Sequence, residues 1–208
     1  MADESSRPAD LREACVREAL AIVETSGVEQ LSLREVARRL GVSHQAPYKH
    51  FASRDHILAE IVARAFDSFA EELDRRPRHQ QPFEDLGAMG MAYLQYAQAH
   101  PLQYRLMFGT PLPDPEQHPQ MMQQARHVFS LLYECLRQLP TNSDREYDSK
   151  ETSLDALFVW STVHGLASIL QTCALQTLDI SADELEDAAP HVLTRIGYAL
   201  GKGVLRDA

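Results

Sequence analysis

The sequence predicts an all-α protein of about nine helices, in which an N-terminal three-helix head is joined by a long helix to a larger helical-bundle body. Apolar residues recur at helical spacing along most of the 208 residues. No segment alternates apolar and polar residues over the length of a β-strand, and no tandem repeat is present. A hydrophobic content of 44% is sufficient for a packed core. We expect the head at residues 1–53 and the body at residues 54–208.

The first helix is expected at residues 10–25, after a polar arm at residues 1–9. Its apolar residues recur every three or four positions, and Gly27 follows its end, where glycine commonly closes a helix. We expect this helix to pack over the two short helices that follow it and to complete the head.

Two short helical patterns separated by a glycine occupy residues 31–54. Ser32 can cap the first helix, because its hydroxyl accepts a backbone N–H bond in the opening turn, and Glu35 completes a capping-box pattern. Gly41 follows the last apolar residue, where glycine adopts a left-handed backbone without strain. Ser43 is placed to cap the second helix. This order predicts a helix-turn-helix unit.

The second of these helices carries side chains suited to nucleic acid. His44 and Gln45 offer the short donor and acceptor groups that read base edges in the major groove. Tyr48, Lys49 and His50 supply the hydroxyl and cationic groups that bind phosphates.

Pro47 lies inside this second helix and interrupts its regular geometry. Proline has no N–H, and its ring crowds the carbonyl four residues earlier, so an α-helix that starts at Ser43 would be disrupted in its first turn. Either the recognition helix is loosened there, or it begins with Pro47 at its first position. Beyond it, Phe51 should close the core of the head, and Ser53 should cap a third helix.

These motifs resemble the DNA-binding end of TetR-type transcriptional repressors. The order V-A-x-x-L-G-V-S, then YKHF and SR, is similar to that family over roughly residues 11–65. The resemblance implies that Tyr48 and His50 contact the DNA backbone and that residues 43–47 read bases. It also implies that Arg54 stands where the family usually has a phosphate-binding lysine. The candidate DNA-binding residues are Ser32, Ser43, His44, Gln45, Ala46, Pro47, Tyr48, Lys49, His50 and Arg54.

The charge of the chain is unevenly distributed. The formal net charge is −10, which argues against indiscriminate binding to nucleic acid. Residues 31–54 nevertheless hold five basic residues against one acidic residue, a local balance of +4. These cations could simply solvate a helix face, but the cap, the turn and the YKHF cluster agree with a DNA-binding role. A basic patch on an acidic body would orient the protein on DNA.

The cysteine usage and the absence of a leader indicate a cytoplasmic protein. Cys15, Cys135 and Cys173 are far apart and form no C-x-x-C pair, which is typical of buried thiols in a reducing compartment. No apolar run follows the first ten residues, so no secretory signal is expected. Residues 156–178 carry no charge, but eight of them are polar, which favours a helix buried by protein over one in lipid.

The body is expected to consist of helices joined by polar or proline-rich loops. The segment from 109 to 119 has four prolines in eleven residues and should be irregular, and residues 141–150 should form another loop. The helices are expected at residues 54–73, 83–100, 101–108, 119–138, 151–178 and 181–205, with Pro190 kinking or splitting the last one.

Small residues on the two final helices predict a homodimer interface of four helices. Packing of the same faces inside one monomer is the alternative, but recognition of paired half-sites by a helix-turn-helix requires a two-fold dimer. The candidate interface residues are Ser161, Gly165, Ser168, Thr172, Ile196, Gly197, Leu200 and Gly201.

Residues 160–165 resemble the W-x-x-x-H-G element of one branch of TetR C-terminal domains, and residues 100–108, HPLQYRLMF, are similar to another part of that branch. Trp160 and His164 lie one helical turn apart and could line a small-molecule pocket or simply fill the core. The candidate pocket residues are Tyr104, Met107, Phe108, Met122, Trp160 and His164.

We therefore predict a dimeric transcriptional regulator, more readily a repressor than an activator, that leaves a pseudopalindromic operator when an unidentified small molecule binds. No hydrolase, metalloprotease, Walker or dinucleotide motif is present, and the scattered histidines lack the spacing of metal ligands. We expect no enzyme activity, cofactor, metal or membrane association. The alternatives are a small-molecule binding protein with a vestigial head and a helical adaptor protein.

Overall fold

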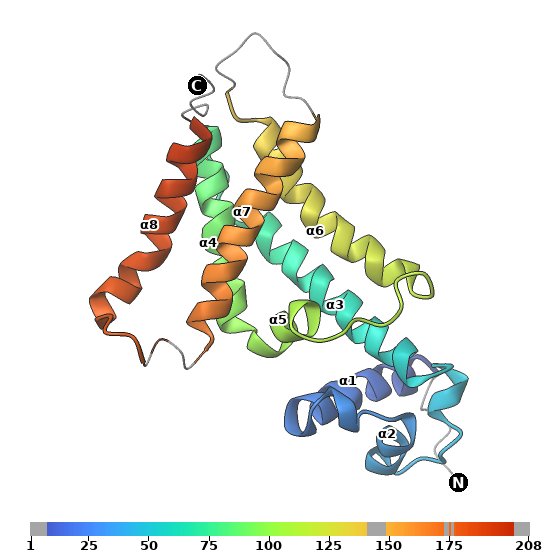
Figure 1. Ribbon diagram of the computed structural model, residues 1–208. Helices are drawn as coiled ribbons and strands as arrows, with labels where there is room; N and C mark the ends of the chain where they lie inside the picture. The colour runs from blue at the N-terminus through green and yellow to red at the C-terminus, as the bar shows by residue number, and fades with distance from the viewer. Residues whose placement is uncertain (1–7, 141–148, 173–174, 176, 202–208) are drawn as a thin grey trace. The chain divides into compact units, whose positions relative to one another are not determined.

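The computed structural model describes residues 8–140, 149–172, 175 and 177–201, and every regular element in these residues is helical (Figure 1). The prediction of an all-α protein is confirmed. There are eight α-helices and two 3₁₀ helices in this part of the chain: α1 (Pro8–Ser26), η1 (Val28–Gln30), α2 (Leu33–Leu40), η2 (Pro47–Lys49), α3 (Arg54–Arg75), α4 (Pro82–Ala99), α5 (Pro101–Phe108), α6 (Pro119–Arg137), α7 (Ser149–Leu170) and α8 (Ala182–Gly201).

The helix boundaries differ from the sequence prediction mainly in the last third of the chain. The expected continuation of α7 to Leu178 was wrong: tight backbone bonds from Gln171 N–H to Ser168 O and from Thr172 N–H to Ile169 O follow the end of the helix at Leu170. Its start at Ser149 lies inside the expected loop, whose residues 141–148 lie outside the described residues, as do Cys173 and the end of the last helix beyond 201.

Pro190 does not split the final helix. It lies inside α8, which continues as one helix from Ala182 to Gly201. Proline removes one hydrogen-bond donor from a helix interior, and packing on neighbouring helices can compensate for that loss. α8 contacts both α4 and α7, so it has such neighbours.

The chain packs as two compact units. Unit 1 contains the described residues up to Phe66 together with Arg105–Ala125, and unit 2 contains Asp67–Tyr104 together with the described residues from Arg126 onward. α3 begins in unit 1 and continues into unit 2 across the bond between Phe66 and Asp67.

Unit 1 is built on an apolar core from α1, α2 and α3. Ile22, Val36 and Ile57 are fully buried there, one from each helix. An ion-pair network ties α1 to α3 at the surface: the guanidinium of Arg12 donates two hydrogen bonds to Glu60 at 2.8 and 3.2 Å. The same guanidinium lies 5.3 Å from the ring centre of Phe51, a cation–π contact that anchors the expected core residue Phe51.

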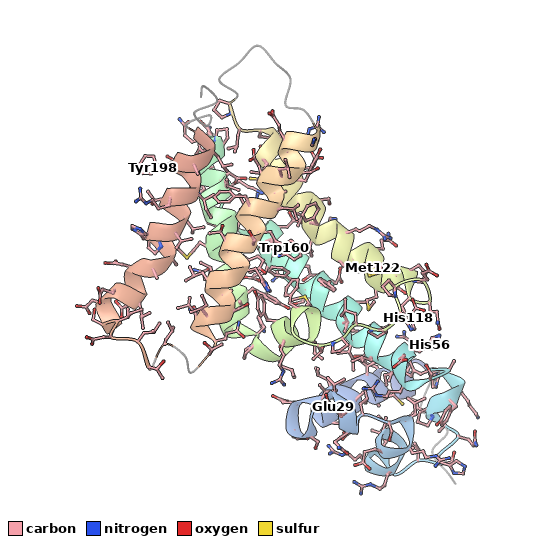
Figure 2. All side chains as sticks on the ribbon, viewed as in Figure 1. Glu29, His56, His118, Met122, Trp160 and Tyr198 are labelled. Atoms are coloured by element: carbon pink, nitrogen blue, oxygen red, sulfur yellow. The ribbon has the colours of Figure 1, made fainter. Side chains whose placement is uncertain are left out.

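A segment from later in the chain also belongs to unit 1. In the segment Arg105–Ala125, Phe108 packs edge-on against Phe66 with ring centres 5.8 Å apart. His118 is 8% exposed and packs edge-on against His56 in the first turn of α3, with ring centres 4.8 Å apart (Figure 2).

Unit 2 is a bundle in which α4, α7 and α8 pack pairwise (Figure 1). α4 approaches α8 closely at Gly90, where an added Cβ would lie 2.3 Å from a methyl group of Leu193. A buried ion pair joins the residues after α3 to α4: the guanidinium of Arg76 donates to Asp85 at 2.8 Å. The Cys135 thiol lies 3.6 Å from the same carboxylate.

The helix that the sequence singled out as uncharged is long and apolar enough to cross a membrane by length and composition alone. In the structure, its Val159, Val163 and Ala167 are buried within the protein, on one face of α7. Leu154, Leu157 and Ile169 of the same helix are exposed, so the expectation of a helix buried by protein on most sides was wrong for this chain alone.

Candidate DNA-binding surface and effector site

The first half of the helix-turn-helix has the predicted local structure. The hydroxyl of Ser32 accepts a hydrogen bond from the backbone N–H of Glu35 at 3.1 Å, so Ser32 caps α2 as expected. Gly41 closes α2 in the left-handed conformation, at φ 67°, as predicted. The backbone N–H of Val42 then donates to Ala37 O and begins the turn.

The second half is not the α-helix that the pattern suggested. The N–H of Ala46 donates to Ser43 O three residues earlier, and Pro47 then takes the first position of the short 3₁₀ helix η2. Ala46, not Ser43, is its N-cap, so the expected capping role of Ser43 was wrong. Since Pro47 has no N–H to donate to Ser43 O, the segment adopts a tight turn where a regular helix would need that bond. We call residues Ser43–Phe51 the recognition segment.

The recognition segment presents its polar residues to solvent and its apolar residues to the core. Tyr48 is 44% exposed although it is aromatic, and Pro47 and Phe51 are buried. His50 is half-buried. The exposed members of the segment are Ser43, His44, Gln45, Tyr48 and Lys49. This surface carries donors, acceptors and a cation within one short stretch, which is the chemistry required to contact a duplex.

Two of the three arginines of α2 are engaged in ion pairs and are therefore less available to contact DNA phosphates than the sequence suggested. The carboxylate of Glu35 accepts hydrogen bonds from Arg38 at 2.6 and 2.8 Å and from Arg39 at 3.0 Å. These bonds, the one from Arg38 being the larger influence, lower the pKa of Glu35 to about 2. Arg39 also pairs with Glu18 of α1 at 3.3 Å. Arg38 and Arg39 are therefore two of the three cations of residues 31–54 that are paired with carboxylates in unit 1, Arg54 being the third, while Arg34 is exposed.

Arg54 has unexpected partners. Its Nε donates to Leu31 O at 3.1 Å and one terminal nitrogen donates to Val28 O at 2.8 Å. The other terminal nitrogen lies 3.1 Å from the carboxylate of Asp55. The sequence offered no signal for this arrangement, because the two carbonyl groups lie 23 and 26 residues away along the chain. At the adjacent Ser53, the hydroxyl accepts from the N–H of His56 at 3.3 Å and caps α3 as predicted.

Three of the candidate pocket residues come together in unit 2, and a fourth residue joins them. The hydroxyl of Tyr104 lies 2.7 Å from His164 Nδ1, and the hydroxyl of Tyr93 lies 3.1 Å from each of these atoms. Trp160 packs near His164 with ring centres 6.1 Å apart. The helical spacing of Tyr93 in α4 predicted only a core position, and no sequence signal pointed to the role of its hydroxyl group. We call Tyr93, Tyr104 and His164 the tyrosine–histidine cluster.

Burial of the tyrosine–histidine cluster favours its uncharged form. Burial raises the pKa of Tyr93 and of Tyr104 above the ordinary range, and burial lowers the pKa of His164. His164 Nε2 also lies 3.4 Å from the hydroxyl of Ser168, one of the candidate interface residues. The cluster can therefore exchange hydrogen bonds with a neutral polar group, and it would resist the burial of an ion.

The other candidate pocket residues belong to unit 1. Met107 is buried, the ring of Phe108 packs on Phe66, and Met122 is half-buried near the start of α6. Trp160 itself is 37% exposed and lies edge-on to Phe129, with ring centres 6.2 Å apart. It therefore does not simply fill the core of unit 2.

The candidate interface residues are distributed between exposed and buried positions. Ser161 and Gly201 are exposed, Gly165, Ser168, Gly197 and Leu200 are half-buried, Ile196 is buried, and Thr172 lies beyond the end of α7. Large apolar side chains that were not among the predicted interface residues are also exposed on these two helices. They are Leu154, Leu157, Phe158, Ile169 and Tyr198.

An exposed, basic helix-turn-helix surface on an all-helical chain defines a helix-turn-helix DNA-binding protein. Residues 16–61 match the family described as bacterial regulatory proteins, tetR family. Residues 86–193, just over half of the chain, match the family described as tetracyclin repressor-like, C-terminal domain. The chain therefore belongs to the TetR family, and it is a DNA-binding transcriptional regulator.

One relative agrees with this assignment, and two solved structures have a similar fold. The chain is 27% identical over 180 residues to the uncharacterized HTH-type transcriptional regulator Rv0681 of Mycobacterium tuberculosis, in a match that covers 85% of this chain and 78% of that protein. Its fold is similar to that of a protein of unknown function from Rhodococcus sp. RHA1, with a TM-score of 0.69, 24% identity, and coverage of 98% and 100%. It is also similar to the TetR family transcriptional regulator PfmR from Thermus thermophilus, with a TM-score of 0.62, 20% identity, and coverage of 88% and 97%.

Proposed function

We propose that this protein is a homodimeric repressor that binds a pseudopalindromic operator in the cytoplasm and leaves it when a small-molecule effector binds. The exposed recognition segment carries the proposal. His44 and Gln45 are presented at its leading end to read base edges. Tyr48 and Lys49 are presented beside them to bind phosphates. The buried Phe51 holds the segment on the core of unit 1.

The exposed apolar face of α7 supports the dimer. Leu154 is 55% exposed and Leu157, Phe158 and Ile169 are similarly open, at spacings that place them along one side of the helix. Exposed apolar groups of this size on one face are typical of surfaces that bind another protein. Small residues such as Ser161 and Gly165 between them would allow a second helix to approach closely. Two copies related by a two-fold axis would place two recognition segments about 34–36 Å apart on DNA.

The tyrosine–histidine cluster supports an effector site in unit 2. Its three polar atoms lie within 3.1 Å of one another among aromatic rings, and Trp160 adjoins them with partial exposure. Sites for small molecules commonly combine apolar walls with a few convergent polar groups. The neutral state of the cluster favours an uncharged effector. Such a ligand would lower DNA affinity by its preference for one shape of the dimer over another.

The decisive experiment selects bound fragments from sheared genomic DNA with the purified protein and inspects them for an inverted repeat. The variant Tyr48→Ala/Lys49→Ala should then lose affinity for the selected fragment while keeping its helical content. Arg126→Ala is the matched control, since it also removes one exposed positive charge but lies in unit 2. The proposal would be contradicted if the double variant and wild type bound the fragment with equal affinity, or if no fragment were selected. Either result would favour a small-molecule binding protein with a vestigial head.

A further inference from the structure

We propose that Arg54 is a positioning residue that closes the helix-turn-helix, and that it is not a phosphate ligand. This inference rests on the proposed DNA-binding role of unit 1. It departs from the family resemblance, which places Arg54 where a cation contacts DNA. The geometry of the guanidinium group carries the inference.

All three nitrogen atoms of the Arg54 guanidinium already have partners. Nε donates to Leu31 O at 3.1 Å, one terminal nitrogen donates to Val28 O at 2.8 Å, and the other pairs with Asp55 at 3.1 Å. The edge formed by Nε and one terminal nitrogen is one of the two edges with which an arginine binds a phosphate or carboxylate through two parallel bonds. In this chain that edge holds two backbone carbonyl groups. On the other edge, each of the two terminal nitrogens already donates one bond, to Val28 O and to Asp55.

The positions of Val28 and Leu31 in the chain determine what the Arg54 contact restrains. Leu31 is 2% exposed and directly precedes the cap of α2, and Arg54 is the first residue of α3. Between these two residues lie α2, the Gly41 turn and the whole recognition segment. The side chain of Arg54 therefore ties together the two ends of the 31–54 loop. A tie across the ends of a loop removes conformations from it and so restricts the orientation of the segment that it encloses.

The contact requires a guanidinium group. The two carbonyl oxygens accept from two nitrogen atoms that are fixed in one plane, and the ammonium of lysine is a single nitrogen at the end of a flexible chain. Lysine would keep the positive charge of residue 54 but would not hold both carbonyl groups. A phosphate contact would instead tolerate lysine, because lysine binds phosphate as a point charge. The two roles thus predict opposite results for Arg54→Lys.

The test compares Arg54→Lys, Arg54→Gln and Lys49→Gln with wild type by fluorescence anisotropy. Affinity is measured between about 50 and 200 mM salt for the fragment selected from genomic DNA and for a mixed-sequence duplex of the same length. We expect both Arg54 variants to lose roughly tenfold in affinity for the selected fragment and less for the mixed duplex. Their salt slopes should remain that of wild type, whereas Lys49→Gln should lower the slope by about 0.9.

Two results would overturn the proposal. One is a salt slope that falls by about 0.9 in Arg54→Gln and is restored, with affinity, in Arg54→Lys. The other is a ratio of affinity for the selected fragment to affinity for the mixed-sequence duplex that is the same in Arg54→Lys, Arg54→Gln and wild type. Hydrogen exchange provides a readout that needs no DNA: the peptide that covers residues 41–53 should exchange faster in Arg54→Lys than in wild type, with the α8 peptide unchanged. If wild type binds neither duplex, the proposed function fails, and this exchange measurement alone decides the role of Arg54.

Discussion

The hydroxyl of Tyr104 lies 2.7 Å from Nδ1 of His164, and the hydroxyl of Tyr93 lies 3.1 Å from each of these two atoms. The two hydroxyl groups and the ring nitrogen thus form three close contacts among themselves. We therefore expect removal of either hydroxyl to change the bonding of the other two groups. The cluster should behave as one coupled unit in stability and in ligand binding.

Replacement of the two tyrosines tests this coupling. Tyr93→Phe and Tyr104→Phe should each lower the free energy of unfolding by about 1 kcal/mol, since each leaves a buried partner less satisfied. The double variant should differ from the sum of the single variants by about 0.5 kcal/mol or more. Urea unfolding followed by circular dichroism measures all four proteins. Additive losses would show that the hydroxyl groups act independently.

The half-buried His164 should make stability depend on pH. Burial lowers the pKa of His164 below its ordinary value of 6.5, so the unfolded chain binds a proton there more readily than the folded protein does. The free energy of unfolding should therefore fall as the pH drops from about 7 to 5. In His164→Gln this fall should be smaller. His127→Gln, a change at an exposed histidine, is the control and should retain the wild-type dependence.

The ion pair between Arg76 and Asp85 should be the most sensitive polar contact in unit 2. Burial acts to raise the pKa of Asp85, but hydrogen bonds from Arg76 and from the N–H of His79 outweigh it and lower that pKa. Asp85→Asn should lower the free energy of unfolding at pH 7 by about 3–5 kcal/mol, because it leaves a buried guanidinium without its counter-charge. Urea unfolding measures the loss.

The neighbouring carboxylate provides the control for Asp85→Asn. Glu84 is largely exposed, so Glu84→Gln should change the free energy of unfolding by less than about 0.5 kcal/mol. An equal loss in both variants at pH 7 would contradict the assignment.

The folded-state pKa of Asp85 is lowered, so the contribution of Asp85 to the free energy of unfolding is fully present above the ordinary pKa of 3.8. It is lost as the pH falls through the lower folded-state pKa.

The exposed side of α7 predicts a change in oligomeric state. A charge on this face should separate the subunits, because an aspartate buried against a second copy would have no counter-charge. Leu154→Asp and Phe158→Asp should therefore give monomers in size-exclusion chromatography with light scattering, where wild type gives dimers. Gln123→Asp, at an exposed position on α6, should remain dimeric. Dimers in all three variants would exclude this side of α7 as the interface.

The local signals of the sequence were sufficient for most of unit 1. The Ser32 cap, the Gly41 turn and the break at Pro47 each depend on a residue's own backbone chemistry, and all three appear in the structure. The end of α7 was misplaced because an uncharged stretch continues past Leu170, where apolar composition gives no stop signal. Arg54 was the hardest to interpret. Its partners are backbone carbonyl groups, which every residue carries, so no pattern of side chains could reveal them.

The close approach at Gly90 has a mechanical consequence. Tyr93 stands one helical turn further along α4, and Gly90 leaves almost no clearance beneath Leu193 of α8. A shift of this turn of α4 toward α8 would bring the backbone at Gly90 closer to the terminal methyl group of Leu193. Glycine at position 90 thus lets α4 and α8 pack closely one helical turn from the proposed effector site, and a side chain there would force Leu193 to move even in the absence of a ligand.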